Sequence, residues 1–359
     1  MAMFDLRKTF LSLVRLGIGN ALRVQLPKDV DWDAVDDLAV RHGLIAIMVD
    51  GTERLPEGPR PPKPVLSQWI GDMLQDYEHR YEQYQRAIAE FATFYNCHGF
   101  KMMVLKGYAC SLNWPKPGHR PCGDIDIWLF GKQKEADAVL AKEKGVKIDK
   151  SHHHHSVFHW GEFMVENHYD FVNVHNYESS AGIEKVFKEL GTDDSYFVEV
   201  YGEKVYLPSP DLHALFLLRH ALSHFAAIGI NLRQVLDWAF FVEKHAREID
   251  WEWFNEMLEK FHMKDFYGCI NAICVEDMGF DATIFHNGQF NPALKERVLQ
   301  DILTPEYGNE LPKYLIPRIF FKFKRWRGNS WKRELCYKES TWSAFWSGVW
   351  SHLLKPNSI

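Results

Sequence analysis

Asp124 and Asp126 are the residues whose types and spacing point most directly to chemistry in this chain. They alternate with Ile125, Ile127 and Leu129 along one short run. As a β-strand, the run would bury its apolar side chains on one face and project both carboxylates from the other. Neighbouring carboxylates repel each other, and a divalent ion that prefers oxygen ligands removes that repulsion. The run therefore predicts half of a magnesium site, although many such pairs are only solvated strand edges.

The stretch before these carboxylates predicts a phosphate site. An apolar strand over residues 101–106 ends in Lys106 and Gly107, and residues 108–112 suit a short helix. A glycine at this junction lets the backbone approach a ligand closely, and the amino end of the helix attracts phosphate. Phosphate beside a divalent metal indicates a nucleotide site.

Together these motifs resemble the polymerase-beta-like nucleotidyltransferase superfamily and, within it, the family of uncharacterised nucleotidyltransferases. That family carries a leucine-lysine-glycine strand end, an arginine and an aspartate-x-aspartate strand, which are matched by residues 105–107, Arg120 and residues 124–126. A third carboxylate is expected on a later strand, within a valine-glutamate-x-histidine stretch. Glu166, followed by His168, fits that place.

The resemblance implies a metal-dependent transfer of a nucleoside monophosphate. Asp124, Asp126 and Glu166 would hold two Mg²⁺ ions, with Mn²⁺ as the alternative metal. One ion would bridge the triphosphate of an NTP, and the other would lower the pKa of an acceptor hydroxyl for attack on the α-phosphorus. Pyrophosphate would leave. The acceptor would be a protein side chain, an RNA end or a small molecule.

The resemblance also implies contacts to the phosphates. Gly107 and the backbone amides after it, beginning with Tyr108, would receive phosphate oxygens, while Lys106 and Arg120 would neutralise their charge. Tyr108 departs from the pattern, because many members of the superfamily have a serine or a second glycine at this position. Metal binding is therefore predicted more firmly than triphosphate binding.

Residues 156–172 predict two strands joined by a tight turn at Gly161. In the second strand, Glu166, His168 and Asp170 would share one face, and the apolar residues between them would share the other. Asp170 is therefore the reserve candidate for the third carboxylate.

Several histidines suit either metal binding or simple polar clusters. His220 and His224 match the helical histidines of the family, and Arg233 and Asp237 match its leucine-arginine and aspartate positions. We favour a polar cluster in which one of the two histidines hydrogen-bonds near Asp237. The histidine run at residues 152–155 has no adjacent cysteine and would alternate between strand faces. This favours a solvated strand entrance over a metal site.

The composition is that of an ordinary soluble protein. Of 359 residues, 46% are hydrophobic and 14% aromatic, which is enough for a sizeable core. The net charge of -6 argues against general binding to nucleic acid or anionic membranes. The start lacks a signal-peptide pattern, no stretch reaches the roughly 18 apolar residues of a membrane span, and the six cysteines are scattered. We therefore predict a cytoplasmic protein without a membrane partner.

The pattern of elements predicts an α+β fold, in which helical regions flank a small nucleotidyltransferase core with a mixed sheet. The predicted divisions are an N-terminal helical region over residues 1–75, the core over residues 76–208 and a C-terminal helical region over residues 209–359. A proline-rich spacer at residues 55–64 precedes a long helix over residues 65–95. Inside the core we expect strands over residues 101–106 and 125–130 and a helix over residues 132–144.

Residues 313–333 combine basic and aromatic side chains without one acidic residue. Such a mixture suits a nucleic-acid partner. The alternative is an amphipathic helix whose long cationic side chains cover its own aromatic residues. We favour the second interpretation because the protein as a whole is acidic.

Two other functions fit parts of the pattern. A sugar-nucleotide glycosyltransferase also uses an aspartate-x-aspartate motif with a divalent ion, but it normally has a larger nucleotide-binding region before that motif. A non-catalytic family member would bind a partner instead, and Tyr108 is the only sign of this in the sequence. The favoured function is a nucleotidyltransferase that uses an NTP and an unidentified hydroxyl acceptor.

Overall fold

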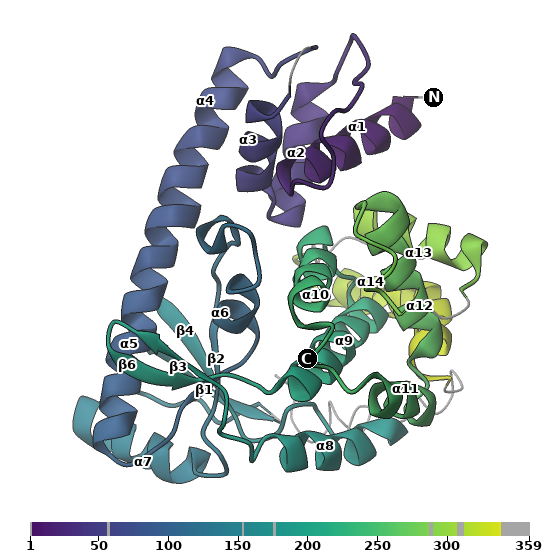
Figure 1. The fold of residues 1–359 in the computed structure, drawn as a ribbon. Helices are drawn as coiled ribbons and strands as arrows, with labels where there is room; N and C mark the ends of the chain where they lie inside the picture. Colours follow the sequence, from purple (N-terminus) through teal and green to yellow (C-terminus); the bar gives the residue numbers. More distant parts are fainter. Residues whose placement is uncertain are drawn as a thin grey trace.

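The chain forms one mixed sheet, with helices both before its first strand and after its last strand in the sequence. The computed structural model describes residues 2–55, 58–152, 154–174, 177–286, 290–306 and 312–338. Figure 1 shows the N-terminal helices at the top, the sheet at the lower left and the C-terminal helices at the right. The predicted α+β class with a mixed sheet is confirmed. Within these ranges, no helix is long and apolar enough to cross a membrane.

The sheet has six strands in the order β3-β4-β2-β1-β6-β5. β2 runs parallel to β4 and β1 parallel to β6, whereas the other neighbours are antiparallel. The strands are β1 (Met103–Val104), β2 (Ile125–Trp128), β3 (His155–Trp160), β4 (Phe163–His168), β5 (Phe197–Val200) and β6 (Glu203–Tyr206). β1 and β2 are thus shorter than predicted, and β4 ends before Asp170.

The hairpin of β5 and β6 is an addition to the predicted core. Its turn consists of Tyr201 and Gly202, which both have positive φ, 49° and 83°. Two such residues form the tight turn that suits the twist of an antiparallel pair. β6 then pairs with β1, the strand that leads to Lys106.

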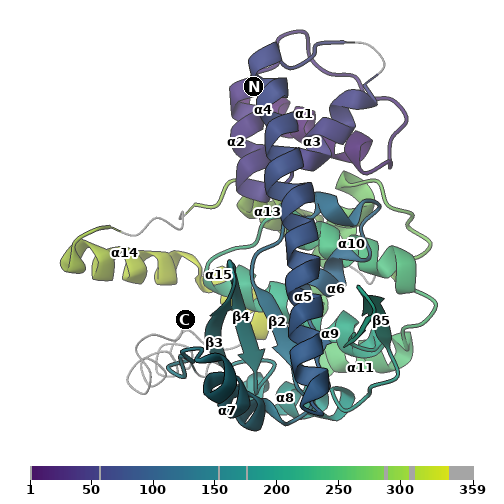
Figure 2. The same cartoon turned by 90° about the vertical axis from the view of Figure 1, so that its left-hand side faces the viewer.

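A long helical rod connects the N-terminal helices to the sheet, as both Figure 1 and Figure 2 show. It consists of α4 (Lys63–Asp72), a π-helical stretch (Met73–His79) and α5 (Arg80–Cys97), which confirms the predicted long helix. The helices before it are α1 (Ala2–Gly17), α2 (Trp32–His42) and α3 (Ile45–Glu53).

The proline-rich stretch does not separate α4 from these N-terminal helices. Trp69 of α4 packs edge-on against Trp32 of α2 and donates a 2.6 Å hydrogen bond to Asp36. The interpretation of residues 55–64 as a spacer is therefore wrong for the described part of that stretch, which excludes residues 56 and 57. The predicted division at residue 75 falls inside the rod and stays a prediction.

Shorter helices complete the core, and the described part of the chain after residue 209 is helical as predicted. α9 is apolar around most of its surface because it lies buried among other helices. The helices are α6 (Lys106–Ser111), α7 (Gln133–Lys144), α8 (Glu178–Leu190), α9 (Pro210–Ala227), α10 (Leu232–His245), α11 (Trp251–Lys260), α12 (Lys264–Ala272), α13 (Pro292–Leu303), α14 (Leu315–Gly328) and α15 (Ser330–Tyr337).

The basic aromatic segment forms α14, which projects away from the body of the molecule in Figure 2. Arg325 lies 5.9 Å above the ring of Phe321, so one cation does cover an aromatic ring. Phe320 and Phe323, however, are 69% and 51% exposed. The prediction that this helix covers its own aromatic residues is therefore wrong for these two.

Candidate active site

The two predicted metal-binding strands lie side by side. β2 and β4 are parallel neighbours, and their register places Asp126 directly beside Glu166. Ile125 and Ile127 of β2 are fully buried in the cluster that packs against α5. The sheet thus aligns two carboxylates that are 40 positions apart in the sequence, with Asp124 just before β2.

Asp126 is the electrostatic centre of the site. Lys106 Nζ lies 2.6 Å from Asp126 Oδ1, and His168 Nε2 donates to the same oxygen at 2.9 Å. Burial opposes ionisation of Asp126, but Lys106 and His168 outweigh it and hold the pKa of this carboxyl well below its usual range. Asp126 is therefore ionised and paired with two cations.

These cations are themselves stabilised by the carboxylates. Burial disfavours the Lys106 ammonium, but Asp126, Glu166 and Asp124 outweigh it and raise its pKa to about 12. Burial likewise opposes protonation of His168, yet its contacts with Asp126 and Glu166 raise its pKa to about 9. His168 was only a secondary candidate in the sequence, and it proves to be bonded directly to the central carboxylate.

Asp124 and Glu166 complete the acidic side of the site. The negative charge of Asp126, together with burial, raises the pKa of Asp124. Burial opposes ionisation of Glu166, but the contact with His168, 3.6 Å from its Oε2, lowers its pKa overall.

The donor set fits a divalent metal. Ligand atoms of Asp126, Glu166 and His168 all lie within 4.8 Å of one another. The repulsion that raises the pKa of Asp124 is of the kind that a bound divalent cation relieves. Carboxylate oxygens are typical ligands of Mg²⁺ and Mn²⁺.

Gly107 is required for a structural reason. A Cβ at this position would lie 2.5 Å from the hydroxyl of Tyr84, which donates a 2.6 Å hydrogen bond to the backbone oxygen of Asp124. That hydrogen bond fixes the backbone where the chain enters β2. Tyr108 is buried beside Tyr81 and Tyr84, and its side chain does not line the cavity around the acidic cluster.

Arg120 forms an ion pair that the sequence did not predict. Its Nε and Nη2 donate to the two carboxylate oxygens of Asp237 at 2.7 and 2.9 Å, and Trp114 Nε1 donates to the same carboxylate at 2.8 Å. This pairing anchors the loop before β2 to α10. Arg120 is thus engaged by a buried carboxylate instead of being free for a phosphate.

The described residues around the acidic cluster line a cavity of about 980 Å³. Its walls come from the sheet, α6, α9, α10, α2 and the end of α13. Among the residues predicted for the site, it brings together Lys106, Gly107, Arg120, Asp124, Asp126, Glu166, His220, His224, Arg233 and Asp237.

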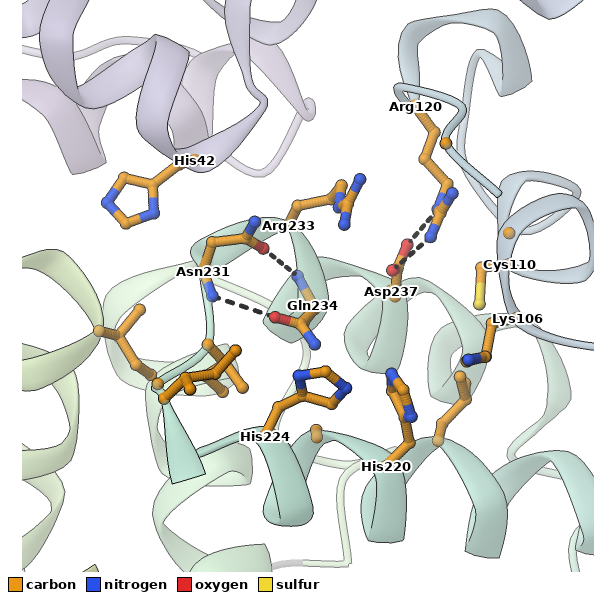
Figure 3. A pocket seen from close by; sticks show the side chains of 18 of the residues that line it. His42, Lys106, Cys110, Arg120, His220, His224, Asn231, Arg233, Gln234 and Asp237 are labelled. Atoms are coloured by element: carbon orange, nitrogen blue, oxygen red, sulfur yellow. Dashed lines mark hydrogen bonds and ion pairs between the residues drawn. The ribbon is translucent and has the colours of Figure 1, made fainter. Parts of the chain in front are cut away.

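His220 and His224 project from α9 into this cavity (Figure 3). Burial and the charge of Lys106 lower the pKa of both, that of His224 to about 4. They are therefore neutral at pH 7. The prediction that one of them hydrogen-bonds near Asp237 is wrong. Among the described residues, the hydrogen bonds to the Asp237 carboxylate come from Arg120 and Trp114.

Asp170 lies outside the cluster. β4 ends at His168, the backbone amide of Asp170 donates to His154 O, and its carboxylate pairs with Lys188 of α8. Asp170 therefore does not share a strand face with Glu166, because the chain turns first.

The histidine run is not the predicted solvated entrance. His155 is buried, and His154 and His155 lie with His168 in one group of potential ligands. Burial lowers the pKa of His154 to about 2 and that of His155 to about 4. His152 is half-buried, and His153 lies outside the described residues.

A mixed sheet that places paired carboxylates beside a lysine-glycine strand end defines a nucleotidyltransferase-like protein. The chain matches the model of the uncharacterised nucleotidyltransferase family over residues 28–279, and it belongs to that family. The resemblance found in the motifs is thereby confirmed.

Comparison with individual proteins adds little to this assignment. No curated protein matches the sequence. A solved structure, an antigenic nucleotidyltransferase-like protein from Paracoccidioides brasiliensis, is similar with 15% identity and a TM-score of 0.32. The similarity covers 44% of this chain and 75% of that one.

Proposed function

We propose that this protein is a metal-dependent nucleotidyltransferase, which moves a nucleoside monophosphate from an NTP to a hydroxyl acceptor and releases pyrophosphate. The observation that carries the proposal is the pairing of Asp126 with Glu166 on adjacent parallel strands, with Asp124 beside them in one cavity. Membership of the family supports the reaction class. A glycosyltransferase has no comparable support.

Asp124, Asp126 and Glu166 would hold Mg²⁺ or Mn²⁺. Bound there, the metal would supply charge stabilisation for the triphosphate and a lower pKa for the acceptor hydroxyl. A cation on Asp126 would compete with Lys106, whose ammonium would then be free to neutralise phosphate oxygens. Gly107 and the backbone amide of Tyr108 would contact the same phosphates. Arg120 would act indirectly, by holding the loop before β2 against Asp237.

The decisive experiment compares Glu166→Gln with Asp170→Asn in a pyrophosphate-release assay with Mg²⁺ and NTPs. If Glu166 activates the acceptor, its loss should lower turnover by orders of magnitude and leave nucleotide affinity largely intact, because that role belongs to the transition state. Asp170→Asn is the matched control, since it removes a carboxylate four residues further on that pairs with Lys188 outside the site. Equal turnover of Glu166→Gln and the parent would refute the assignment of the third carboxylate.

A non-catalytic binding protein is the second candidate function. The observation that favours it is the ion pair between Lys106 and Asp126, in which the chain itself supplies a counter-ion for the central carboxylate. Calorimetric titration separates the two functions. A catalytic protein should bind nucleotide more tightly with Mg²⁺, whereas a non-catalytic one should bind it with no dependence on the metal.

A further inference from the structure

Arg233 occupies a fixed position on the helical side of the cavity. It is the second residue of α10, whose start is held by a capping box between Asn231 and Gln234. Its side chain runs close to Gly43. A Cβ added to Gly43 would lie 3.8 Å from Arg233 Cδ and 3.1 Å from Pro121 Cγ. Figure 3 shows it rising from α10 toward the side of the cavity where Arg120 lies.

The guanidinium of Arg233 lies near carboxylates but forms no ion pair with them in the part of the chain that the structure describes. Among the described residues, no carboxylate lies within ion-pair distance of it, and its buried Nε has no hydrogen-bond partner. Asp237, on the same helix, accepts hydrogen bonds from Arg120 and Trp114 and acts on Arg233 only through its charge. A buried cation without a partner is costly to maintain, and this makes it a candidate for ligand binding.

The electrostatics support an anionic ligand. Burial, followed by the positive charge of Arg120, lowers the pKa of Arg233, and the negative charges of Asp237 and Asp124 offset this only in part. An anion next to the guanidinium would counter both effects. Two of the predicted metal-binding carboxylates, those of Asp126 and Glu166, lie on the sheet side of the cavity, whereas Arg233 lies on α10.

We propose that Arg233 forms an anion subsite of the cavity that binds a phosphate group of a substrate. The ligand class rests on the proposed function, because a nucleotidyltransferase acts on phosphorylated molecules. Arginine suits this task, since its planar fork gives a phosphate two parallel hydrogen bonds. The cavity volume of about 980 Å³ is at the upper end of the range for a single small ligand, so a nucleotide and a small acceptor would fit together. The phosphate is therefore either the nucleotide's own or that of a small phosphorylated acceptor.

The test uses inorganic phosphate and the full chain without metal. Calorimetric titration at constant ionic strength should show phosphate binding by the parent, and Arg233→Met should weaken it about tenfold or more. Arg233→Lys, which keeps the charge but loses the fork, should fall between the two. Arg86→Met is the matched control, because Arg86 is exposed and pairs with Glu82 on the surface of α5. It should bind phosphate like the parent.

A second titration identifies the source of the phosphate. When the protein is saturated with Mg²⁺ and a non-hydrolysable nucleotide, continued binding of inorganic phosphate at Arg233 would assign the subsite to the acceptor. Displacement of the phosphate, with weaker nucleotide binding in Arg233→Met, would assign it to the nucleotide. Both results support the subsite.

Two results would overturn the proposal: a parent that does not bind phosphate, or an Arg233→Met variant that folds and binds it equally well. If Arg233→Met does not fold, Arg233→Lys decides, since unchanged phosphate affinity there would also refute a bidentate subsite. Phosphate binding needs no catalysis and no metal. A failure of the pyrophosphate assay would therefore not be mistaken for a failure of the subsite.

Discussion

At the scale of single residues, Asp124 and Asp126 differ sharply although they stand two positions apart. From the sequence, both would be expected to repel each other and to gain when one is neutralised. In the structure, Asp126 is paired with Lys106 and His168, whereas Asp124 mainly experiences the charge of Asp126. The same substitution should therefore have opposite effects on stability at the two positions.

We predict that Asp126→Asn lowers the free energy of unfolding by about 3 kcal/mol, because it removes the carboxylate to which both buried cations, Lys106 and His168, are bonded. Asp124→Asn should leave that free energy unchanged or raise it slightly, because it relieves repulsion. Urea denaturation of the metal-free protein at pH 7 measures both. Each variant should also lose Mg²⁺-dependent nucleotide binding in calorimetry. Equal losses of stability would show that the ion pairs around Asp126 contribute little.

At the scale of elements, periodicity predicts the parts of the fold whose pattern is local. The helix expected over residues 132–144 and the first strand of the predicted hairpin agree within a residue with the observed bounds of α7 and β3, whereas β4 ends four residues before the predicted hairpin does. The alternating pattern at residues 197–206, with its tyrosine-glycine turn, contains a signal for β5 and β6 that the predicted core did not include.

What the sequence could not show depends on long-range contacts. The end of β4 is set where the amides of Tyr169 and Asp170 both turn to His154 O. The partner of Arg120 is Asp237, 117 positions away, and no local pattern links the two. The sequence therefore could not predict the conformation of Asp170 or the role of Arg120. It could predict which residues form the acidic cluster.

One long-range contact ties the N-terminal helices to α10. His42, at the end of α2, accepts a 3.1 Å hydrogen bond on Nδ1 from the backbone amide of Leu232. Burial and the nearby charge of Arg41 lower its pKa to about 4. The neutral ring is therefore the form that holds the two elements together.

We predict that the contribution of His42 to the free energy of unfolding becomes smaller as the pH is lowered. Because the folded pKa of His42 is depressed from about 6.5, its contribution is complete above pH 6.5 and falls as pH drops toward 4. The unfolded chain binds the extra proton in this window. His42→Gln should therefore lose less stability than the parent between pH 7 and pH 5, by about 2 kcal/mol. Urea denaturation across that range measures the difference. Parallel curves for the two proteins would contradict the proposed contact.

At the scale of the whole molecule, charge is unevenly distributed. The net charge is -6, yet residues 312–333 contain no acidic residue. These residues include α14, which projects from the body and exposes Phe320 and Phe323 (Figure 2). The basic groups of this helix serve either to bind a polyanion or to keep an exposed aromatic surface in solution.

We predict the second role and test it with a variant of α14 that combines Lys322→Gln, Lys324→Gln, Arg325→Gln and Arg327→Gln. Loss of four charges beside exposed aromatic rings should lower solubility, while binding to a single-stranded oligonucleotide should be as weak as in the parent. Fluorescence anisotropy at two salt concentrations and light scattering measure these properties. The control carries Lys8→Gln, Lys28→Gln, Lys63→Gln and Lys134→Gln, which remove the same charge from exposed sites elsewhere. A tight, salt-sensitive oligonucleotide complex of the parent would reverse this interpretation. In that case only the α14 variant, and not the control, should flatten the salt dependence of oligonucleotide binding, by a slope of about 0.7 for each phosphate that the helix no longer neutralises. A nucleic-acid acceptor would then become the leading proposal.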